Sequence, residues 1–149
     1  MHLRDFSISE TSGVKKSYRG TYLGACQKGT RNAHGDVTCF DYLKRMGYNY
    51  VQLQPVFDHH KTYDKGGKLL YNWGYDPENY NVPDRQFAAD QKNPVAPILE
   101  LKKMIQAYHE AGIGVIMDVV YNHTYSSYSS TFQLSVPAYY YRMHDNGSF

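Results

Sequence analysis

An amphipathic helix followed almost at once by an apolar strand most constrains the fold of this chain. Residues 97–112, PILELKKMIQAYHEAG, have the apolar period of a helix, which Pro97 would begin and Gly112 would end. The apolar stripe consists of Ile98, Leu101, Ile105 and Tyr108. Residues 113–121, IGVIMDVVY, follow directly as an almost continuous β-branched run, which is typical of a strand covered on both faces.

The same succession occurs earlier in the chain. Residues 37–47, VTCFDYLKRMG, predict a helix with Asp36 as its N-cap and Gly47 at its end. Its stripe consists of Phe40, Leu43 and Met46. Residues 48–57, YNYVQLQPVF, predict a strand because apolar and polar side chains alternate at Val51, Gln52, Leu53 and Gln54. With residues 2–6, HLRDF, as a further strand, the β-α-β-α-β order predicts an α/β fold with a parallel sheet.

The connections in this predicted sheet are of two kinds. Each helix reaches its next strand within one or two residues, whereas each strand precedes a long irregular stretch: 7–35, 58–95 and 122–149. Loops of this length inside a compact domain are usually functional. Because strand-to-helix loops of α/β folds emerge at the carboxyl ends of the strands, where ligands bind, we expect a ligand at that face.

These loops are rich in aromatic residues. The chain has 16 Tyr and a single Trp, and residues 71–83, YNWGYDPENYNVP, contain that Trp and three of the Tyr without any apolar period. The aromatic residues of the loops are Tyr18, Tyr22, Tyr63, Tyr71, Trp73, Tyr75, Tyr80, Tyr125, Tyr128, Tyr139, Tyr140 and Tyr141. An aromatic ring with a polar tip suits the apolar face and hydroxyl rim of a sugar. The alternative is that these rings pack beneath the long loops.

Two polar residues stand at the end of the last apolar run. Asp118 interrupts this run, and a buried carboxylate is costly unless it is paired and hydrogen-bonded. His123 follows just past the predicted end of the strand, where its side chain would reach the loop face. A structural Asp with an Arg partner and a surface His are the alternatives to a functional pair.

Four motifs carry a resemblance to a known family. DVVYNH (118–123) resembles the first conserved region of the α-amylase superfamily of glycoside hydrolases, and YNWGYDP (71–77) resembles a loop of the type I pullulanases, the α-1,6-glucan debranching enzymes. HLRDFS (2–7) and VPAYYYRM (136–143) are similar to further segments of these enzymes. The resemblance implies that residues 1–149 are an N-terminal fragment of a catalytic (β/α)8 TIM barrel. Because a barrel needs about 250 residues, the chain would supply about its first three βα units.

The resemblance also implies roles for individual residues. The family's equivalent of Tyr75 is the platform on which the sugar at the cleavage point stacks, and that of His123 hydrogen-bonds the primary hydroxyl of this sugar. The equivalent of Asp118 helps to hold an arginine near the nucleophile. Trp73 and Asp76 would shape the same pocket.

The motifs that carry the chemistry do not occur in the chain. Retaining glycosidases need a nucleophile and an acid/base, two carboxylates about 5–5.5 Å apart. The family carries the nucleophile in a Phe-Arg-Phe-Asp setting after the fourth strand, its Glu after the fifth and a third Asp after the seventh. We therefore expect a debranching hydrolase that acts on α-glucans such as pullulan, glycogen or branched dextrins, whose 149-residue part alone is inactive and needs the rest of the barrel.

No cofactor or metal is expected. Asn122 matches a calcium ligand of many α-amylases, but debranching enzymes commonly lack that site and the sequence offers no other ligand cluster. Cys26 and Cys39 fit two reduced thiols better than a disulfide.

Other function classes find little support. A net charge of +2 with interspersed signs argues against nucleic acid, no apolar run approaches the about 18 residues of a membrane span, and the first ten residues do not read as a signal peptide. Two alternatives remain open: a non-catalytic α-glucan-binding fragment, and a small flavodoxin-like α/β domain with an unrelated ligand.

Overall fold

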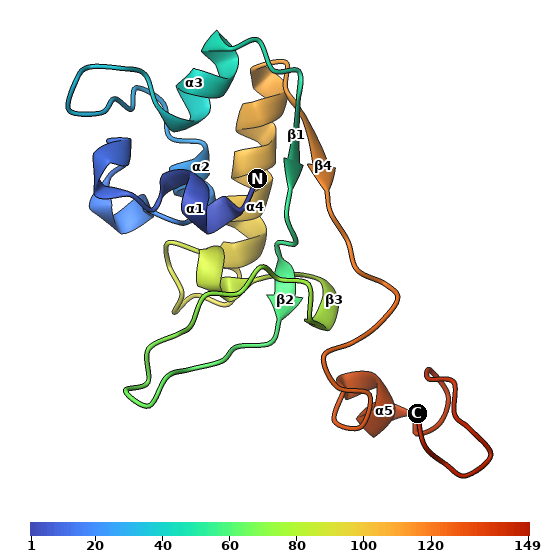
Figure 1. Ribbon diagram of the computed structural model, residues 1–149. Helices are drawn as coiled ribbons and strands as arrows, with labels where there is room; N and C mark the ends of the chain where they lie inside the picture. The colour runs from blue at the N-terminus through green and yellow to red at the C-terminus, as the bar shows by residue number, and fades with distance from the viewer. The chain divides into compact units, whose positions relative to one another are not determined.

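The computed structural model describes all 149 residues and divides the chain into two compact units. The first unit comprises Met1–Val56 and Pro83–Asp118, and the second comprises Phe57–Val82 and Val119–Phe149. The first contains α1 (Leu3–Ser7), α2 (Tyr22–Ala25), α3 (Cys39–Arg45), β1 (Tyr50–Leu53), α4 (Ala96–Glu110), β4 (Gly114–Met117) and three short 3-10 helices, Glu10–Ser12, Lys16–Tyr18 and Arg85–Phe87 (Figure 1). The second contains β2 (Phe57–His59), α5 (Thr131–Ser135) and β3 (Pro77–Pro83), whose last residue falls in the first unit.

The first unit is built on a parallel crossover. β1 and β4 pair in parallel from Tyr50 opposite Gly114 to Leu53 opposite Met117, and α4 lies along one face of this pair (Figure 1). Val51 and Leu53 are buried on the α4 side, whereas Tyr50 is 62% exposed and Ile116 is 47% exposed. The predicted parallel pair is confirmed. The expectation that residues 113–121 form a strand covered on both faces is wrong, because β4 has four residues and one face of the pair lacks a covering helix.

The core of the first unit joins this pair to α1–α4. Phe40 of α3 meets Tyr108 of α4 edge to face, with ring centroids 5.1 Å apart, and the Tyr108 hydroxyl donates to the Ala25 carbonyl at 2.9 Å. The buried stripe of α4 consists of Pro97, Leu101, Met104 and Tyr108. Ile98 and Met46, which the apolar periods placed in stripes, are instead 45% and 53% exposed. Tyr22 belongs to this core, so for this loop tyrosine the packing alternative is correct.

The start of the chain differs from the prediction. Residues 2–6 were expected to form a strand, but Leu3–Ser7 is a helix. His2 caps its start by accepting a hydrogen bond from the Asp5 amide, and Leu3 and Ser7, one turn apart, are buried. Leu3 and Phe6 are three residues apart, a spacing that places both side chains on one side of a helix but on opposite faces of a strand. Only Met1 lies along β1, where its amino group donates to the Gln52 carbonyl and its own carbonyl accepts from the Gln54 amide at 2.9 Å.

The other predicted helix is confirmed with a different start. α3 begins after Thr38, not at an Asp36 cap, and the Asp36 carboxylate instead accepts from the Asn32 amide group at 3.0 Å. Gly47 follows the helix with a φ of 72°, in the left-handed region that favours glycine, so its predicted place at the helix end is confirmed.

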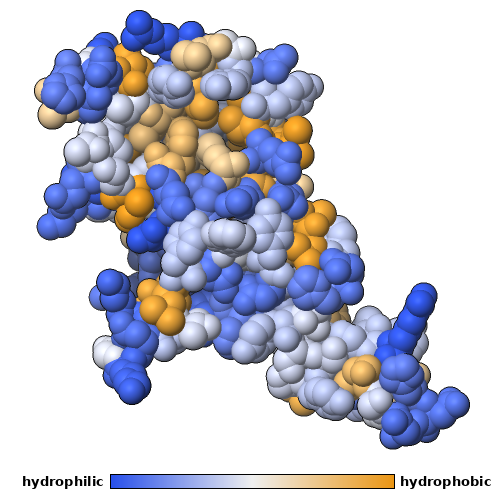
Figure 2. All heavy atoms as spheres, viewed as in Figure 1, coloured by the Kyte–Doolittle hydropathy of each residue, from blue (hydrophilic) through white to orange (hydrophobic).

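The second unit is held mainly by aromatic and polar contacts. β2 and β3 form a two-stranded sheet, and Phe57 of β2 packs edge to face on Tyr80 of β3, with ring centroids 6.3 Å apart. α5 has only five residues and ends before Pro137. Many large side chains remain exposed, and Figure 2 shows apolar side chains among hydrophilic ones on the visible face. None of the helices combines the length and apolar character needed to cross a membrane.

Candidate substrate-binding site

The loop before β3 forms an open aromatic hollow in the second unit. Its volume is about 580 Å³, and its lining consists of Tyr71, Asn72, Trp73, Tyr75 and Asp76. Trp73 is 62% exposed and Tyr71 is 52% exposed. Exposed rings gathered around a hollow, with a few polar groups among them, are typical of a ligand site rather than of a core.

Asn72 holds this loop in shape. Its Nδ2 donates to both carboxylate oxygens of Asp76 at 3.0 Å and to the His60 carbonyl at 3.1 Å. Its Oδ1 accepts from the Gly74 amide at 2.8 Å. Gly74 has a φ of 89°, which other residues rarely adopt, so the turn that presents Trp73 depends on both residues. The sequence interpretation missed Asn72, although an Asn two residues before a Gly is a signal of such a turn.

The segment after β4 is hydrogen-bonded to this loop. The His123 Nε2–H donates to the Tyr75 carbonyl at 2.9 Å, and the Tyr80 hydroxyl donates to the His123 carbonyl at 2.6 Å. The Tyr125 amide donates to the Pro77 carbonyl at 2.9 Å. This arrangement assigns the ring proton of neutral His123 to Nε2 and leaves Nδ1 as the ring nitrogen that can accept from a ligand.

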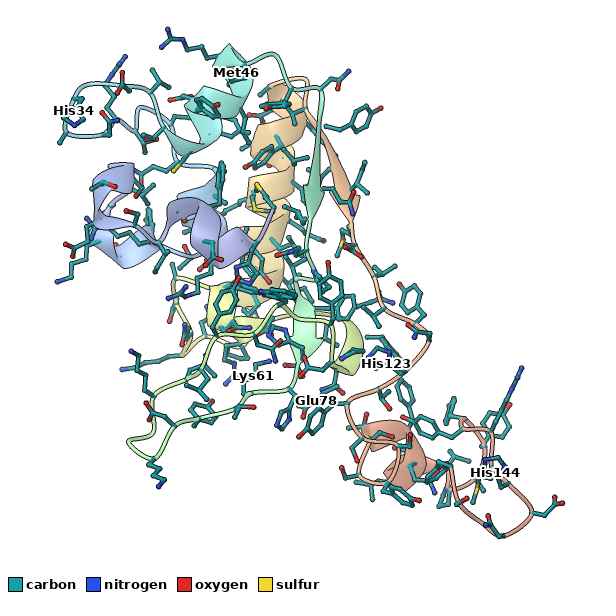
Figure 3. The ribbon with its side chains drawn as sticks, in the orientation of Figure 1. His34, Met46, Lys61, Glu78, His123 and His144 are labelled. Atoms are coloured by element: carbon teal, nitrogen blue, oxygen red, sulfur yellow. The ribbon has the colours of Figure 1, made fainter.

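His60, which directly follows β2, supports the loop. The ring of His60 stacks on Tyr125 with centroids 3.5 Å apart, and its Nδ1 lies 2.8 Å from Oε1 of Glu78. Figure 3 shows Glu78 on β3 and His123 on the segment that follows β4. The His60 carbonyl is also the one that Asn72 binds. These contacts connect residues 60, 72, 78 and 125 into one network, of which Asn72 lines the aromatic hollow.

Asp58 is engaged in a second polar cluster. Its carboxylate accepts from Lys61 Nζ and from Asn79 Nδ2, each at 2.6 Å. Burial raises the pKa of Asp58, but these two hydrogen bonds and the Lys61 charge outweigh burial and lower it overall. Asp58 is therefore a structural anion that connects β2 to β3.

The predicted site residues fall in different places. Trp73, Tyr75 and Asp76 line the aromatic hollow, and His123 contacts it through the Tyr75 carbonyl. Asp118 belongs to the first unit, where it is half-buried and its Oδ2 lies 3.5 Å from Gln52 Nε2. No group of three or more His, Cys, Asp or Glu side chains is arranged to hold a metal ion.

The fold and the site define a class of protein. A parallel βαβ crossover whose strands are followed by long loops is the repeating unit of parallel α/β folds, including the α/β barrels. The α-amylase catalytic-domain family matches residues 15–145, and the chain belongs to this family. The predicted α-amylase membership and TIM-barrel superfamily fold are confirmed, and the flavodoxin-like alternative is excluded.

Within this family the chain is similar to debranching enzymes. It is 39% identical over 144 residues to the pullulanase of Bacillus subtilis (strain 168), and this alignment covers 97% of the chain and 20% of the relative. It is 35% identical over 158 residues to the isoamylase of Pseudomonas amyloderamosa, and this alignment covers 100% of the chain and 18% of the relative. The chain thus spans about a fifth of the length of these relatives. The predicted likeness to pullulanases is confirmed.

Solved structures of pullulanases are similar to this chain over nearly its whole length. The pullulanase of Paenibacillus barengoltzii, in complex with maltohexaose and α-cyclodextrin, superposes with a TM-score of 0.91 at 43% identity over 100% of this chain and 23% of that one. Type I pullulanase from Bacillus subtilis str. 168, in complex with maltose, gives a TM-score of 0.88 at 39% identity over 99% of this chain and 20% of that one.

Proposed function

We propose that residues 1–149 are an N-terminal part of the catalytic barrel of an α-1,6-glucan debranching hydrolase and carry part of its sugar-binding pocket. The observation that carries this proposal is the aromatic hollow, in which Trp73 and Tyr75 are presented by a turn that Asn72 and Gly74 define. The names of the relatives, and the maltooligosaccharides in the complexes of two structural neighbours, support an α-glucan such as pullulan, glycogen or a branched dextrin as the ligand.

Each site residue has a proposed role. The Tyr75 ring is the platform on which the sugar at the cleavage point stacks, while Trp73 and Asp76 shape the wall of the same pocket. His123 holds the Tyr75 carbonyl through Nε2 and accepts a sugar hydroxyl at Nδ1, which is supported by the observed hydrogen bond. Asp118 orients an arginine supplied by another part of the protein.

The catalytic carboxylates are proposed to come from residues outside this chain. A retaining glycosidase needs two carboxyl groups about 5–5.5 Å apart with the scissile bond between them. Two carboxylates of the second unit, Asp58 and Asp76, have structural partners. Asp58 is held by Lys61 and Asn79, and Asp76 is held by Asn72. The non-catalytic alternative would use the same hollow to bind a glucan without cleaving it.

Assays of reducing-end release from pullulan test this proposal. The full-length protein that contains this chain should hydrolyse pullulan, whereas the isolated 149-residue chain should give no turnover above the blank once contaminating amylase is excluded. A full-length protein that binds pullulan without cleaving it would support the non-catalytic alternative. Turnover by the isolated chain would contradict the proposed origin of the carboxylates.

A further inference from the structure

The second unit carries another, larger hollow that the proposed roles leave unexplained. Its volume is about 740 Å³, and five aromatic rings line it, among them Tyr121, Tyr140 and Tyr141. Its polar lining includes His123 and Arg142. We call this feature the tyrosine hollow.

Two of the tyrosine rings are held in place through their hydroxyl groups. The Tyr141 hydroxyl donates to Ser130 Oγ at 2.6 Å and lies 2.8 Å from Thr124 Oγ1. The Tyr121 hydroxyl donates to Asn81 Oδ1 at 2.9 Å. Because these hydroxyls are bound within the protein, the part of each residue that is left for a ligand is the ring, already oriented.

The third ring is well exposed. Tyr140 is 55% exposed and packs against Phe132, with centroids 5.1 Å apart at an angle of 51°. Tyr121 is 59% exposed. Rings that are held by neighbours but remain open to solvent can bury apolar area on binding with little loss of side-chain freedom.

The lining also indicates the class of ligand. No Asp or Glu lines the tyrosine hollow, which disfavours a cation, and Arg142 is its only cationic side chain apart from a protonated His123, which disfavours a polyanion. Flat rings next to hydroxyl, amide and guanidinium groups suit a neutral ring that carries hydroxyl groups. A sugar has this chemistry.

His123 connects the tyrosine hollow to the aromatic hollow. His123 lines the first, and its Nε2–H donates at 2.9 Å to the carbonyl of Tyr75, which lines the second. We propose that the tyrosine hollow binds a further glucose unit of the same α-glucan chain whose other unit stacks on Tyr75. This inference rests on the proposed function, because it names a second subsite for the same ligand.

Calorimetric titration of the full-length protein with maltose and with maltohexaose tests the inference. Both sugars are α-1,4-linked, so an α-1,6 hydrolase does not consume them. The wild-type protein should bind maltohexaose more tightly than maltose. Tyr140→Ala should weaken maltohexaose binding by roughly 3–10-fold, the value of one aromatic contact, with maltose binding unchanged. Tyr140→Phe should retain the wild-type affinity for maltohexaose.

Further variants keep the test decisive if Tyr140→Ala fails to fold. Arg142→Gln, at an exposed position, should also weaken only maltohexaose binding. Tyr63→Ala is the matched control, because Tyr63 is 58% exposed in the same unit but lines neither hollow. Unchanged maltohexaose affinity in both Tyr140→Ala and Arg142→Gln, or an equal loss for both sugars, would overturn the second subsite. If Tyr75→Ala leaves maltose binding unchanged, or if neither sugar binds the wild-type protein, the proposed function itself fails.

Discussion

Tyr75 contributes two separable groups to the site, its ring and its backbone carbonyl. Because His123 binds the carbonyl, a side-chain substitution removes the platform without removing that hydrogen bond. An aromatic contact is worth about 0.5–1.5 kcal/mol beyond burial, and a shift of the bound sugar by about 1 Å costs up to about 100-fold in rate. From these values we expect Tyr75→Ala to lower kcat/KM for α-1,6 cleavage in the full-length protein by at least roughly tenfold. Tyr75→Phe should stay near wild type. Steady-state kinetics with circular dichroism measures this. Near-wild-type activity of Tyr75→Ala, or activity lost only through unfolding, would assign the ring to structure.

His123 has two ring nitrogens with different proposed tasks. Gln can place a donor near the position of Nε2, which binds the Tyr75 carbonyl, whereas Asn can place a polar atom near that of Nδ1, which would face the sugar. Since one hydrogen bond is worth about 0.5–1.5 kcal/mol, His123→Ala should lower kcat/KM roughly tenfold. If the hydrogen bond to the Tyr75 carbonyl dominates, His123→Gln should retain more activity than His123→Asn. The reverse order would assign the effect to the contact with the sugar. Equal activity of all variants and wild type would remove His123 from the site.

Asn72 is predicted to position the loop without touching the sugar itself. Asn72→Ala removes hydrogen bonds worth about 0.5–1.5 kcal/mol each, and Asn72→Asp adds a negative charge beside Asp76. In the 149-residue chain, where Trp73 is the single Trp and therefore reports this loop directly, both should loosen the turn and lower the fluorescence anisotropy. Asn32→Ala is the matched control, because Asn32 Oδ1 holds a similar turn in the first unit by accepting from the His34 and Asp36 amides. An anisotropy that changes equally in both variants of Asn72 and in Asn32→Ala would contradict the positioning role.

The sequence predicted part of this site, and its limits have a physical cause. The motif YNWGYDP placed Trp73, Tyr75 and Asp76 in one hollow because neighbours in a tight turn are necessarily close in space. The contact between His123 and the Tyr75 carbonyl joins residues 48 positions apart and depends on the tertiary fold. The clustering of Tyr121 with Tyr140 around a second hollow is equally non-local and was not predicted.

At the scale of elements, long periodic segments were predictable and short ones were not. α4 has 15 residues, so a few exposed positions such as Ile98 did not obscure its period, and β1 shows the expected alternation at Val51 and Leu53. Residues 2–6 carry only two apolar positions, Leu3 and Phe6, which are too few to establish a period, but their spacing of three and the cap from His2 both favour the observed helix. The partial exposure of β4 was not predicted, because the apolar content of a strand alone does not show whether a second layer covers it.

The Asp58 carboxylate, which connects β2 to β3, should make the stability of the fold depend on pH. The pKa of Asp58 is lowered in the folded chain, so its ionised form stabilises the fold above the ordinary carboxyl pKa. This contribution is lost as the pH falls from that ordinary value through the lower folded-state value. Asp58→Asn should therefore be less stable than wild type near neutral pH, and the difference should narrow in acid. Urea unfolding of both proteins across this range measures the effect, with Asp145→Asn, at an exposed position, as the control. A difference in stability that does not change with pH would contradict this account of Asp58.

At the scale of the whole molecule, the open side of the β1–β4 pair predicts self-association of the isolated chain. Tyr50 and Ile116 expose apolar area on this face, and a two-stranded parallel sheet also leaves backbone groups at its edges without a neighbouring strand. A closed barrel has no such edges, so the rest of the protein is expected to cover them. Sedimentation velocity of the isolated chain should therefore show oligomers, aggregates or a loosely folded species rather than a compact monomer.

A pair of substitutions tests whether this face is responsible. Ile116→Lys places a charge on the open face and should shift the isolated chain toward monomer, because a lysine at an exposed strand opposes pairing with another chain. Leu99→Lys makes the same change in charge on α4, where Leu99 is 49% exposed, and should leave association unchanged. A wild-type chain that sediments as a compact monomer and unfolds cooperatively would show that the exposed face is tolerated. Equal effects of the two lysines would show that net charge, and not the open sheet, controls the association.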